Sequence, residues 1–211
     1  DFISHPSKHY SQIKEALNQG KHVLCESPFA LKEEECGELE KLAIENDLIL
    51  MDSIKTAYST AYNRLLLLLK GGKIGDVYSI DATCTSLRDY DENSWNSITG
   101  WAPTALLPIF QILGVDYKNK TINSLILDEK PNFDLFTKID FQYENAVASI
   151  KVANSVKSEG ELIISGSEGY AYVPAPWWKT DYFELRYENQ EDNKKYFYQL
   201  DGEGIRYELE S

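Results

Sequence analysis

The chain has 211 residues, 43% of them hydrophobic and 26% charged, and its 21 basic and 34 acidic side chains give a formal charge of −13. This composition is typical of a cored globular protein with one large domain or two small ones, and no apolar run is long enough for a membrane span. The acidic balance and the lack of Lys and Arg clusters argue against a nucleic-acid partner, because phosphate binding depends on such clusters.

The first quarter of the chain alternates helical patterns with short apolar runs. Apolar spacing predicts two amphipathic helices, one that ends at Gly20 and one that begins after Leu31. The runs at residues 22–25 and 48–51 are too short for helices, and they predict neighbouring parallel strands that are buried on both faces. This alternation is typical of a doubly wound parallel sheet, which we expect to occupy residues 1–55.

The remainder of the chain changes to a period of two. One more helix is expected at about residues 60–70, and from residue 77 onward alternating apolar and polar residues predict strands, with a hairpin turn at residues 144–145. Residues 102–113 predict one long helix laid across the sheet. Further strands are expected at residues 161–165, 170–173, 183–187 and 195–198. Residues 56–211 should therefore form an α+β domain with a large, open, mixed sheet.

The sheet of this second region is expected to have helix cover on one face only. Apolar side chains such as Ile139 or Phe141 would then need a partner, and exposed apolar patches usually mark interfaces. We therefore expect a homo-oligomer that forms through the open sheet face.

The cysteines, Cys25, Cys36 and Cys84, are odd in number and lack Cys-x-x-Cys spacing. They indicate neither a disulfide framework nor a zinc site, and a reducing cytoplasm without a bound metal fits best. No signal peptide opens the chain. Its first residues, DFIS, look like the tail of a buried strand, so we also expect a fragment that lacks the preceding part of its domain.

Three stretches of the sequence resemble one enzyme family. GKHVLCESPFAL, ECGELEKLAIENDLILMDSIKTAY and LLKGGKIGDVYSIDA are similar to the glucose-fructose oxidoreductase, inositol dehydrogenase and rhizopine catabolism (Gfo/Idh/MocA) family of NAD(P)-dependent oxidoreductases. The resemblance covers essentially the whole chain, weakly after Ser86. It implies that residues 1–55 are the C-terminal part of a Rossmann dinucleotide-binding domain and that residues 56–211 bind substrate and pair subunits. The implied cofactor is NAD or NADP, and the implied substrate is a sugar or polyol.

The sequence departs from the family pattern in its phosphate loop and its catalytic groups. No glycine-rich loop follows a buried strand and opens a helix. Ser27 replaces the family's lysine, whose charge lowers the cost of a developing alkoxide and which relays a proton. A serine hydroxyl can hold a cofactor hydroxyl by one hydrogen bond but cannot replace that charge. In the family's Asp-x-Gly-x-His helix, Pro103, Ala105 and Leu107 stand for Asp, Gly and His, so the usual catalytic Lys and His are absent.

The resemblance implies a set of candidate site residues. The cofactor would be contacted by Ser4, His5, His9, Glu26, Ser27 and Pro28, although His5 and His9 fit a helix cap or a surface position as well. Lys55 would lie on the nicotinamide side and supply the cation that Ser27 does not, and Tyr58 shares that candidacy; the alternative for both is a solvated turn. Trp95, Trp101 and Trp177 either wall a sugar pocket or fill the space between helix and sheet.

Three functions remain compatible with these residues. The first is an NAD(P)-dependent sugar or polyol oxidoreductase. The second is a catalytically degenerate member of the family that keeps a nucleotide or sugar ligand but transfers no hydride. The third is an interaction module that oligomerises through its sheet. The loss of the lysine and the histidine favours the second over the first, while Glu26 and Pro28 keep cofactor contact plausible.

Overall fold

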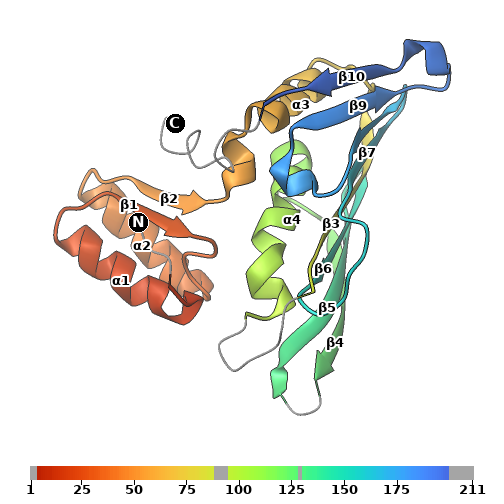
Figure 1. The fold of residues 1–211 in the computed structure, drawn as a ribbon. Helices are drawn as coiled ribbons and strands as arrows, with labels where there is room; N and C mark the ends of the chain where they lie inside the picture. The colour runs from red at the N-terminus through yellow and green to blue at the C-terminus, as the bar shows by residue number, and fades with distance from the viewer. Residues whose placement is uncertain (1–3, 88–94, 128–129, 200–211) are drawn as a thin grey trace. The chain divides into compact units, whose positions relative to one another are not determined.

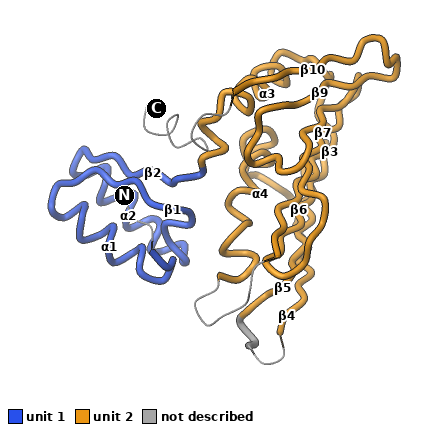
Figure 2. Tube along the Cα trace, viewed as in Figure 1, with its two compact units in different colours: residues 1–54 blue, residues 55–211 orange. Residues whose placement is uncertain are grey.

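The computed structural model describes residues 4–87, 95–127 and 130–199, with no side-chain detail at residues 130–132. The chain divides into two compact units, residues 1–54 and residues 55–211 (Figure 2). Among the described residues, none of the helices combines the length and the apolar character that a membrane crossing needs.

The first unit contains two helices and two strands, in the order helix, strand, helix, strand. They are α1 (Pro6–Asn18), β1 (Val23–Glu26), α2 (Glu33–Glu45) and β2 (Leu50–Ser53). The two strands pair in parallel, with Val23 opposite Leu50 and Cys25 opposite Asp52. The parallel pair predicted from the two short apolar runs is thus confirmed, with each strand displaced by one or two residues toward the C-terminus.

The helices of the first unit bury their apolar stripes against this strand pair. The buried side chains form one cluster: Ile13, Leu17, Val23, Cys25, Leu39 and Ala43. Helix α1 stops where Gly20 adopts a φ of +70°, a left-handed conformation that glycine adopts without a steric penalty. The acidic residues at the start of α2 lie in its first turn, where they suit the helix dipole.

The second unit is built on one eight-stranded sheet in the order β10-β9-β8-β7-β3-β6-β5-β4. All neighbouring strands are antiparallel except β3 and β6, which run parallel. The strands are β3 (Val77–Thr85), β4 (Asn119–Leu127), β5 (Lys130–Gln142), β6 (Val147–Ala153), β7 (Leu162–Gly166), β8 (Tyr170–Val173), β9 (Tyr182–Arg186) and β10 (Lys194–Phe197). The predicted α/β class, with a parallel pair followed by a large mixed sheet, is confirmed.

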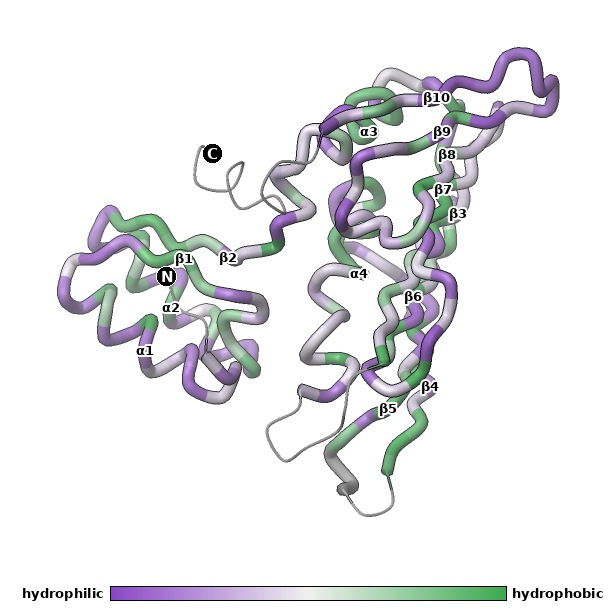
Figure 3. Tube along the Cα trace, in the orientation of Figure 1, coloured by the Kyte–Doolittle hydropathy of each residue, from purple (hydrophilic) through white to green (hydrophobic). Residues whose placement is uncertain are grey.

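Two α-helices cover one face of this sheet. Helices α3 (Thr60–Lys70) and α4 (Ser97–Leu113) share a core with the inward side chains of the strands, among them Ile80, Ile150 and Leu185. Figure 1 shows α4 lying along one face of the strands, and the described part of the chain places no helix on the other face. Hydrophobic residues appear in α3 and in central strands such as β3 and β7, whereas the connection between β9 and β10 is hydrophilic (Figure 3).

The structure corrects one sequence expectation about this sheet and adds one strand that the sequence did not predict. Ile139 and Phe141 do not lie on the open face: they are 7% and 5% exposed, and the Phe141 ring packs edge-on against Phe110 of α4 at 6.0 Å. Alternation marks two faces of a strand but not which of them a helix covers. Strand β4 was not predicted at all, because as an edge strand it exposes nearly all of its residues and shows little contrast between its faces.

Candidate functional site

The carboxyl ends of β1 and β2 carry a group of polar side chains. Strand β1 ends at Glu26 and continues into Ser27, while Asp52 and Ser53 end β2. The Ser27 hydroxyl donates a hydrogen bond to Oδ2 of Asp52 at 3.2 Å, and both residues are half-buried. Open α/β sheets bind their ligands at the carboxyl ends of the strands, so this edge is the candidate ligand-binding edge of the first unit.

Asp52 was not among the predicted site residues. The available signal was an acidic residue directly after a short buried strand of a parallel pair. Its charge acts on the neighbouring strand: burial raises the pKa of the Cys25 thiol to about 12, with the carboxylates of Asp52 and Glu26 adding to the effect. Cys25 is therefore a protonated core residue and no nucleophile.

His9 fastens the turn that follows Ser27. Its ring is fully buried, with Nδ1 2.8 Å from the carbonyl oxygen of Pro28 and Nε2 2.8 Å from that of Ser4. Both ring nitrogens are thus engaged by main-chain groups. The structure gives His9 a positioning role, since it ties the Ser27–Pro28 turn to the start of α1, and leaves it no exposed nitrogen for direct contact with a dinucleotide.

His5 and Ser4 lie at the beginning of α1. Nδ1 of His5 accepts from the backbone N–H of Ser7 at 3.3 Å, which makes His5 the N-cap of the helix. The Ser4 hydroxyl donates to Oε1 of Gln12 at 2.7 Å. The cap that the sequence offered as the alternative for His5 is therefore present, and its predicted contact with a cofactor stays a prediction.

In the second unit, Lys55 and Tyr58 begin and end a 3₁₀ turn, η1 (Lys55–Tyr58). Between them, the Thr56 hydroxyl donates to the carbonyl oxygen of Trp178 at 2.8 Å. This bond links η1 to the short turn η2 (Trp177–Lys179), more than a hundred residues further along the chain. The turn that carries Lys55 and Tyr58 is thus held against the turn that carries Trp177 and Trp178.

The tryptophans divide into a buried and a partly exposed set. Trp177 is 0% exposed, and its indole N–H donates to the carbonyl oxygen of Thr83 at 3.1 Å, so it fills the core and cannot wall an open pocket. Its neighbour Trp178 packs on Trp101 with ring centroids 4.8 Å apart. A Cβ on Gly160 would meet the Trp178 ring at 2.9 Å, so this glycine makes room for the pair.

A buried polar network fixes the N-terminus of α4. Asp134 accepts from the backbone N–H of Ile98 at 3.3 Å and from the Thr137 hydroxyl at 2.7 Å. The Asn154 amide donates to the carbonyl oxygens of Trp95 at 2.5 Å and Asn96 at 3.0 Å. Further along this helix, Ala105 is fully buried. The segment from Pro103 to Leu107 has no side chain that titrates near neutral pH, so α4 supplies no acid or base there.

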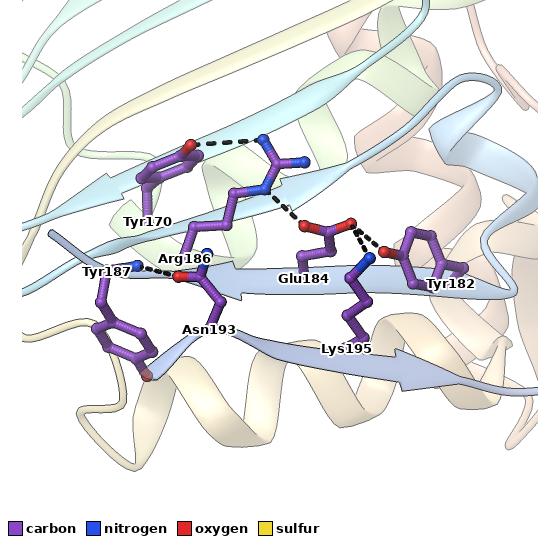
Figure 4. A network of polar contacts seen from close by, with 7 residues as sticks. All are labelled: Tyr170, Tyr182, Glu184, Arg186, Tyr187, Asn193 and Lys195. Atoms are coloured by element: carbon purple, nitrogen blue, oxygen red, sulfur yellow. Dashed lines mark hydrogen bonds and ion pairs between the residues drawn. The ribbon is translucent and has the colours of Figure 1, made fainter. Parts of the chain in front are cut away.

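The open face of the sheet carries a second polar network at β8, β9 and β10 (Figure 4). Arg186 donates from Nε to Oε2 of Glu184 at 2.6 Å, and its guanidinium carbon lies 4.4 Å from the centroid of the Tyr172 ring. Tyr182 donates to the same carboxylate, and the Lys195 ammonium lies 3.7 Å from it. This network lines a shallow cavity of about 400 Å³.

Another cavity, of about 620 Å³, lies between the C-terminal ends of α3 and α4 and the start of β3. No predicted site residue lines it. Within the part of the chain that the structure describes, no three His, Cys, Asp or Glu side chains gather into a possible metal site.

Residues 2–53 match the family model described as "Oxidoreductase family, NAD-binding Rossmann fold" (GFO_IDH_MocA). The first quarter of the chain thus matches the Gfo/Idh/MocA family of oxidoreductases. The similarity of the chain to curated members is local. It is 36% identical over 92 residues to scyllo-inositol 2-dehydrogenase (NADP(+)) IolU of Bacillus subtilis, a match that covers 43% of this chain and 27% of that protein. It is 34% identical over 77 residues to dTDP-3,4-didehydro-2,6-dideoxy-alpha-D-glucose 3-reductase of Streptomyces violaceoruber, covering 36% and 22%.

Solved structures of oxidoreductases share the fold over nearly the whole chain. The 3-ketoreductase KijD10 from Actinomadura kijaniata, in complex with TDP-benzene and NADP, matches with a TM-score of 0.79 at 16% identity, over 96% of this chain and 64% of that one. An oxidoreductase from Agrobacterium radiobacter in complex with NAD+, L-tartaric acid and magnesium matches with a TM-score of 0.74 at 16% identity, over 96% and 64%. This chain therefore spans less than two thirds of these relatives, and the likeness shows the fold alone.

Proposed function

We propose that the protein is an NAD(P)-dependent oxidoreductase that acts on a sugar or polyol. The observation that carries this proposal is the match of residues 2–53 to an NAD-binding Rossmann family, combined with the polar edge of Glu26, Ser27 and Asp52 at the carboxyl ends of its strands. Two curated relatives act, by their names, on an inositol and on a deoxysugar nucleotide. The three unpaired cysteines suit a cytoplasmic location.

The first unit fits one part of a dinucleotide. Glu26, Ser27 and Asp52 offer carboxylate and hydroxyl groups, which suit ribose or sugar hydroxyls. The sequence contains no glycine-rich loop between a strand and a helix, so these residues offer no cradle for the pyrophosphate. When bound, a nicotinamide cofactor would accept or donate the hydride; the protein's own residues would orient the substrate and handle the proton.

Lys55 and Tyr58 are the proposed catalytic residues of the second unit. The Lys55 ammonium would lower the energy of a developing alkoxide, and the Tyr58 phenol would donate a hydrogen bond to the same oxygen. The stacked pair of Trp101 and Trp178 would form an apolar wall for the carbon face of a sugar. The hydrogen bond between Thr56 and Trp178, which joins η1 to η2, supports a site that combines Lys55 and Tyr58 with these tryptophans.

The alternative is a degenerate family member that binds a ligand without hydride transfer. The feature that favours it is the replacement of the family's catalytic lysine by Ser27 and of its histidine by Leu107.

Reduction of NAD and NADP by the purified protein across a panel of sugars and polyols separates these functions. We expect turnover in the wild type and a large loss in Lys55→Ala. Lys41→Ala, which removes a lysine that is 73% exposed on α2, should be unaffected. If the wild type binds cofactor but reduces none of it, the degenerate function is correct; if Lys55→Ala keeps full turnover, the catalytic role of Lys55 is wrong.

We further propose that two copies of the protein associate through the open sheet face. This face carries a cluster of aromatic and basic side chains: Tyr170, Tyr172, Tyr182 and Arg186. The Phe197 ring, whose centroid lies 4.6 Å from that of Tyr182, is 73% exposed. Tyr and Arg are enriched at protein interfaces, and the mixed charges of Glu184, Arg186 and Lys195 can pair with the same patch on a second copy.

Sedimentation tests this association at micromolar concentration. The wild type should sediment as a dimer, and Phe197→Glu should shift it toward monomer, because the added charge would be buried in the interface. Ile44→Glu is the matched control, since Ile44 is 79% exposed on α2. A monomeric wild type would contradict the proposal.

A further inference from the structure

The hydrogen bond between Ser27 and Asp52 changes what the serine at this position can do. A lone serine hydroxyl is a poor proton acceptor. Here the hydroxyl points its proton at Oδ2 of Asp52, 3.2 Å away, so its oxygen lone pairs remain available to a second donor. The parallel register places Asp52 directly opposite Cys25, which brings it beside the turn that carries Ser27.

We propose that Ser27 and Asp52 form a two-step proton relay that accepts the proton of the substrate hydroxyl during oxidation. This inference rests on the proposed oxidoreductase function. The carbinol O–H bond breaks and its proton passes to Oγ of Ser27, while the proton of Ser27 passes to Oδ2 of Asp52. The hydride of the carbinol carbon would pass to an oxidised nicotinamide cofactor, and that carbon would become a carbonyl carbon. Asp52 ends as a carboxylic acid and returns its proton to water.

The relay limits the negative charge on the substrate oxygen in a different way from a lysine. A cation stabilises an alkoxide once it forms, whereas a carboxylate behind a hydroxyl removes the proton as the hydride leaves, so that no full alkoxide charge accumulates. The distance of 3.2 Å suits a hydrogen bond that shortens when a substrate hydroxyl is bound, because catalytic hydrogen bonds are often long in ligand-free enzymes.

The surrounding contacts hold the relay in place. His9 fixes the carbonyl oxygen of Pro28, the residue after Ser27, at 2.8 Å. Asp52 belongs to β2, which is hydrogen-bonded to β1 along its whole length. Neither partner of the relay therefore depends on a freely moving loop for its position.

A measurement without cofactor tests the hydrogen bond itself. The carboxyl carbon of Asp52 is followed by ¹³C NMR over a pH titration of the wild type and of Ser27→Ala. Because a donor to the ionised form favours that form, the Asp52 signal should titrate at a higher pH in Ser27→Ala than in the wild type. Ser11→Ala is the matched control, since the hydroxyl of that serine donates to the backbone oxygen of Lys8 in the same unit.

Kinetics then test the transfer. Ser27→Ala and Asp52→Asn should each lower turnover by about 10²-fold or more, the usual contribution of a general base. The loss of turnover should exceed any loss of cofactor affinity, because the relayed protons move only in the transition state. Ser27→Thr keeps the hydroxyl and should keep most of the turnover. Asp47→Asn, in the loop before β2, should behave as the wild type. When the wild-type rate is plotted against the fraction of D₂O in the solvent, the plot should be curved, because two protons move in the transition state.

The outcomes separate the relay from the function on which it rests. A wild type that binds neither cofactor and oxidises nothing would overturn the proposed function and the relay together. An active wild type whose Ser27→Ala variant keeps full turnover would overturn the relay alone. An Asp52 titration that is unchanged in Ser27→Ala would do the same, because the hydrogen bond would then be absent.

Discussion

The indole N–H of Trp177 donates to the backbone carbonyl oxygen of Thr83, 3.1 Å away, inside the core of the second unit. The ring is completely buried and lies beside Tyr62, with centroids 6.5 Å apart. Truncation would leave a large cavity and an unpaired carbonyl group. We expect Trp177→Ala to lower the free energy of unfolding by about 3–5 kcal/mol in urea titrations.

The neighbouring Trp178 is the tryptophan expected to bind sugar, and its variant is compared with Trp177→Ala. Trp178 is partly exposed, so Trp178→Ala should destabilise the protein clearly less than Trp177→Ala while weakening sugar binding in calorimetry. Equal destabilisation by both variants, with no change in sugar affinity, would assign both rings to the core.

The polar network at the start of α4 should contribute measurably to stability. Asp134 is 5% exposed and accepts from Ile98 and Thr137, so Asp134→Ala leaves a buried hydroxyl and a part-buried backbone N–H without this acceptor. We expect a loss of about 2 kcal/mol or more in the free energy of unfolding. Asp140→Ala, on the same strand, removes only a surface ion pair to Lys138 and should cost about 1 kcal/mol or less. Similar losses for the two variants would contradict this account.

The cysteines should differ in reactivity between the native and unfolded protein. Burial raises the pKa of the Cys84 thiol far above its usual range and that of Cys25 to about 12, and only a thiolate attacks a disulfide reagent. At pH 8 the native protein should therefore leave these two thiols unmodified, while the less buried Cys36 reacts slowly. Mass spectrometry should find all three modified in urea. Rapid labelling of Cys84 in the native state would show that this core opens.

Glu184 should make stability depend on pH in the acidic range. The hydrogen bond from Arg186 lowers the pKa of this carboxyl below its usual value. The hydrogen bond from Tyr182 and the positive charge of Lys195 act in the same direction. A carboxylate with a lowered pKa in the folded state stabilises the protein fully above its unfolded pKa, about 4.3, and this stabilisation is lost as the pH falls through the folded value.

The matching measurement compares the wild type with Glu184→Gln in urea titrations from neutral pH down to about pH 3. The wild type should be the more stable at neutral pH, and the difference should shrink as the carboxylate is protonated. A difference that stays constant over the whole range would mean that the ionised form of Glu184 contributes nothing.

Local patterns in the sequence predicted most of the secondary structure. The helical spacing of Tyr62, Leu65 and Leu69 led to the bounds of α3, and the runs around Cys25 and Met51 led to the parallel pair. Short-range periodicity is a property of the chain itself, because each element selects one face by the spacing of its own residues. The weak alternation of β4 shows the limit of that signal, since this strand exposes both of its faces.

The sequence by itself also singled out Ser27, but only the tertiary structure decided its partner. Asp52 lies 25 residues away and reaches Ser27 only because β1 and β2 pair in a particular register. In the same way, the packing of α4 decided that Phe141 is covered, and the core decided that Trp177 is buried while Trp178 is not. These contacts join segments far apart in the chain, and no local spacing encodes which of two faces another segment will cover.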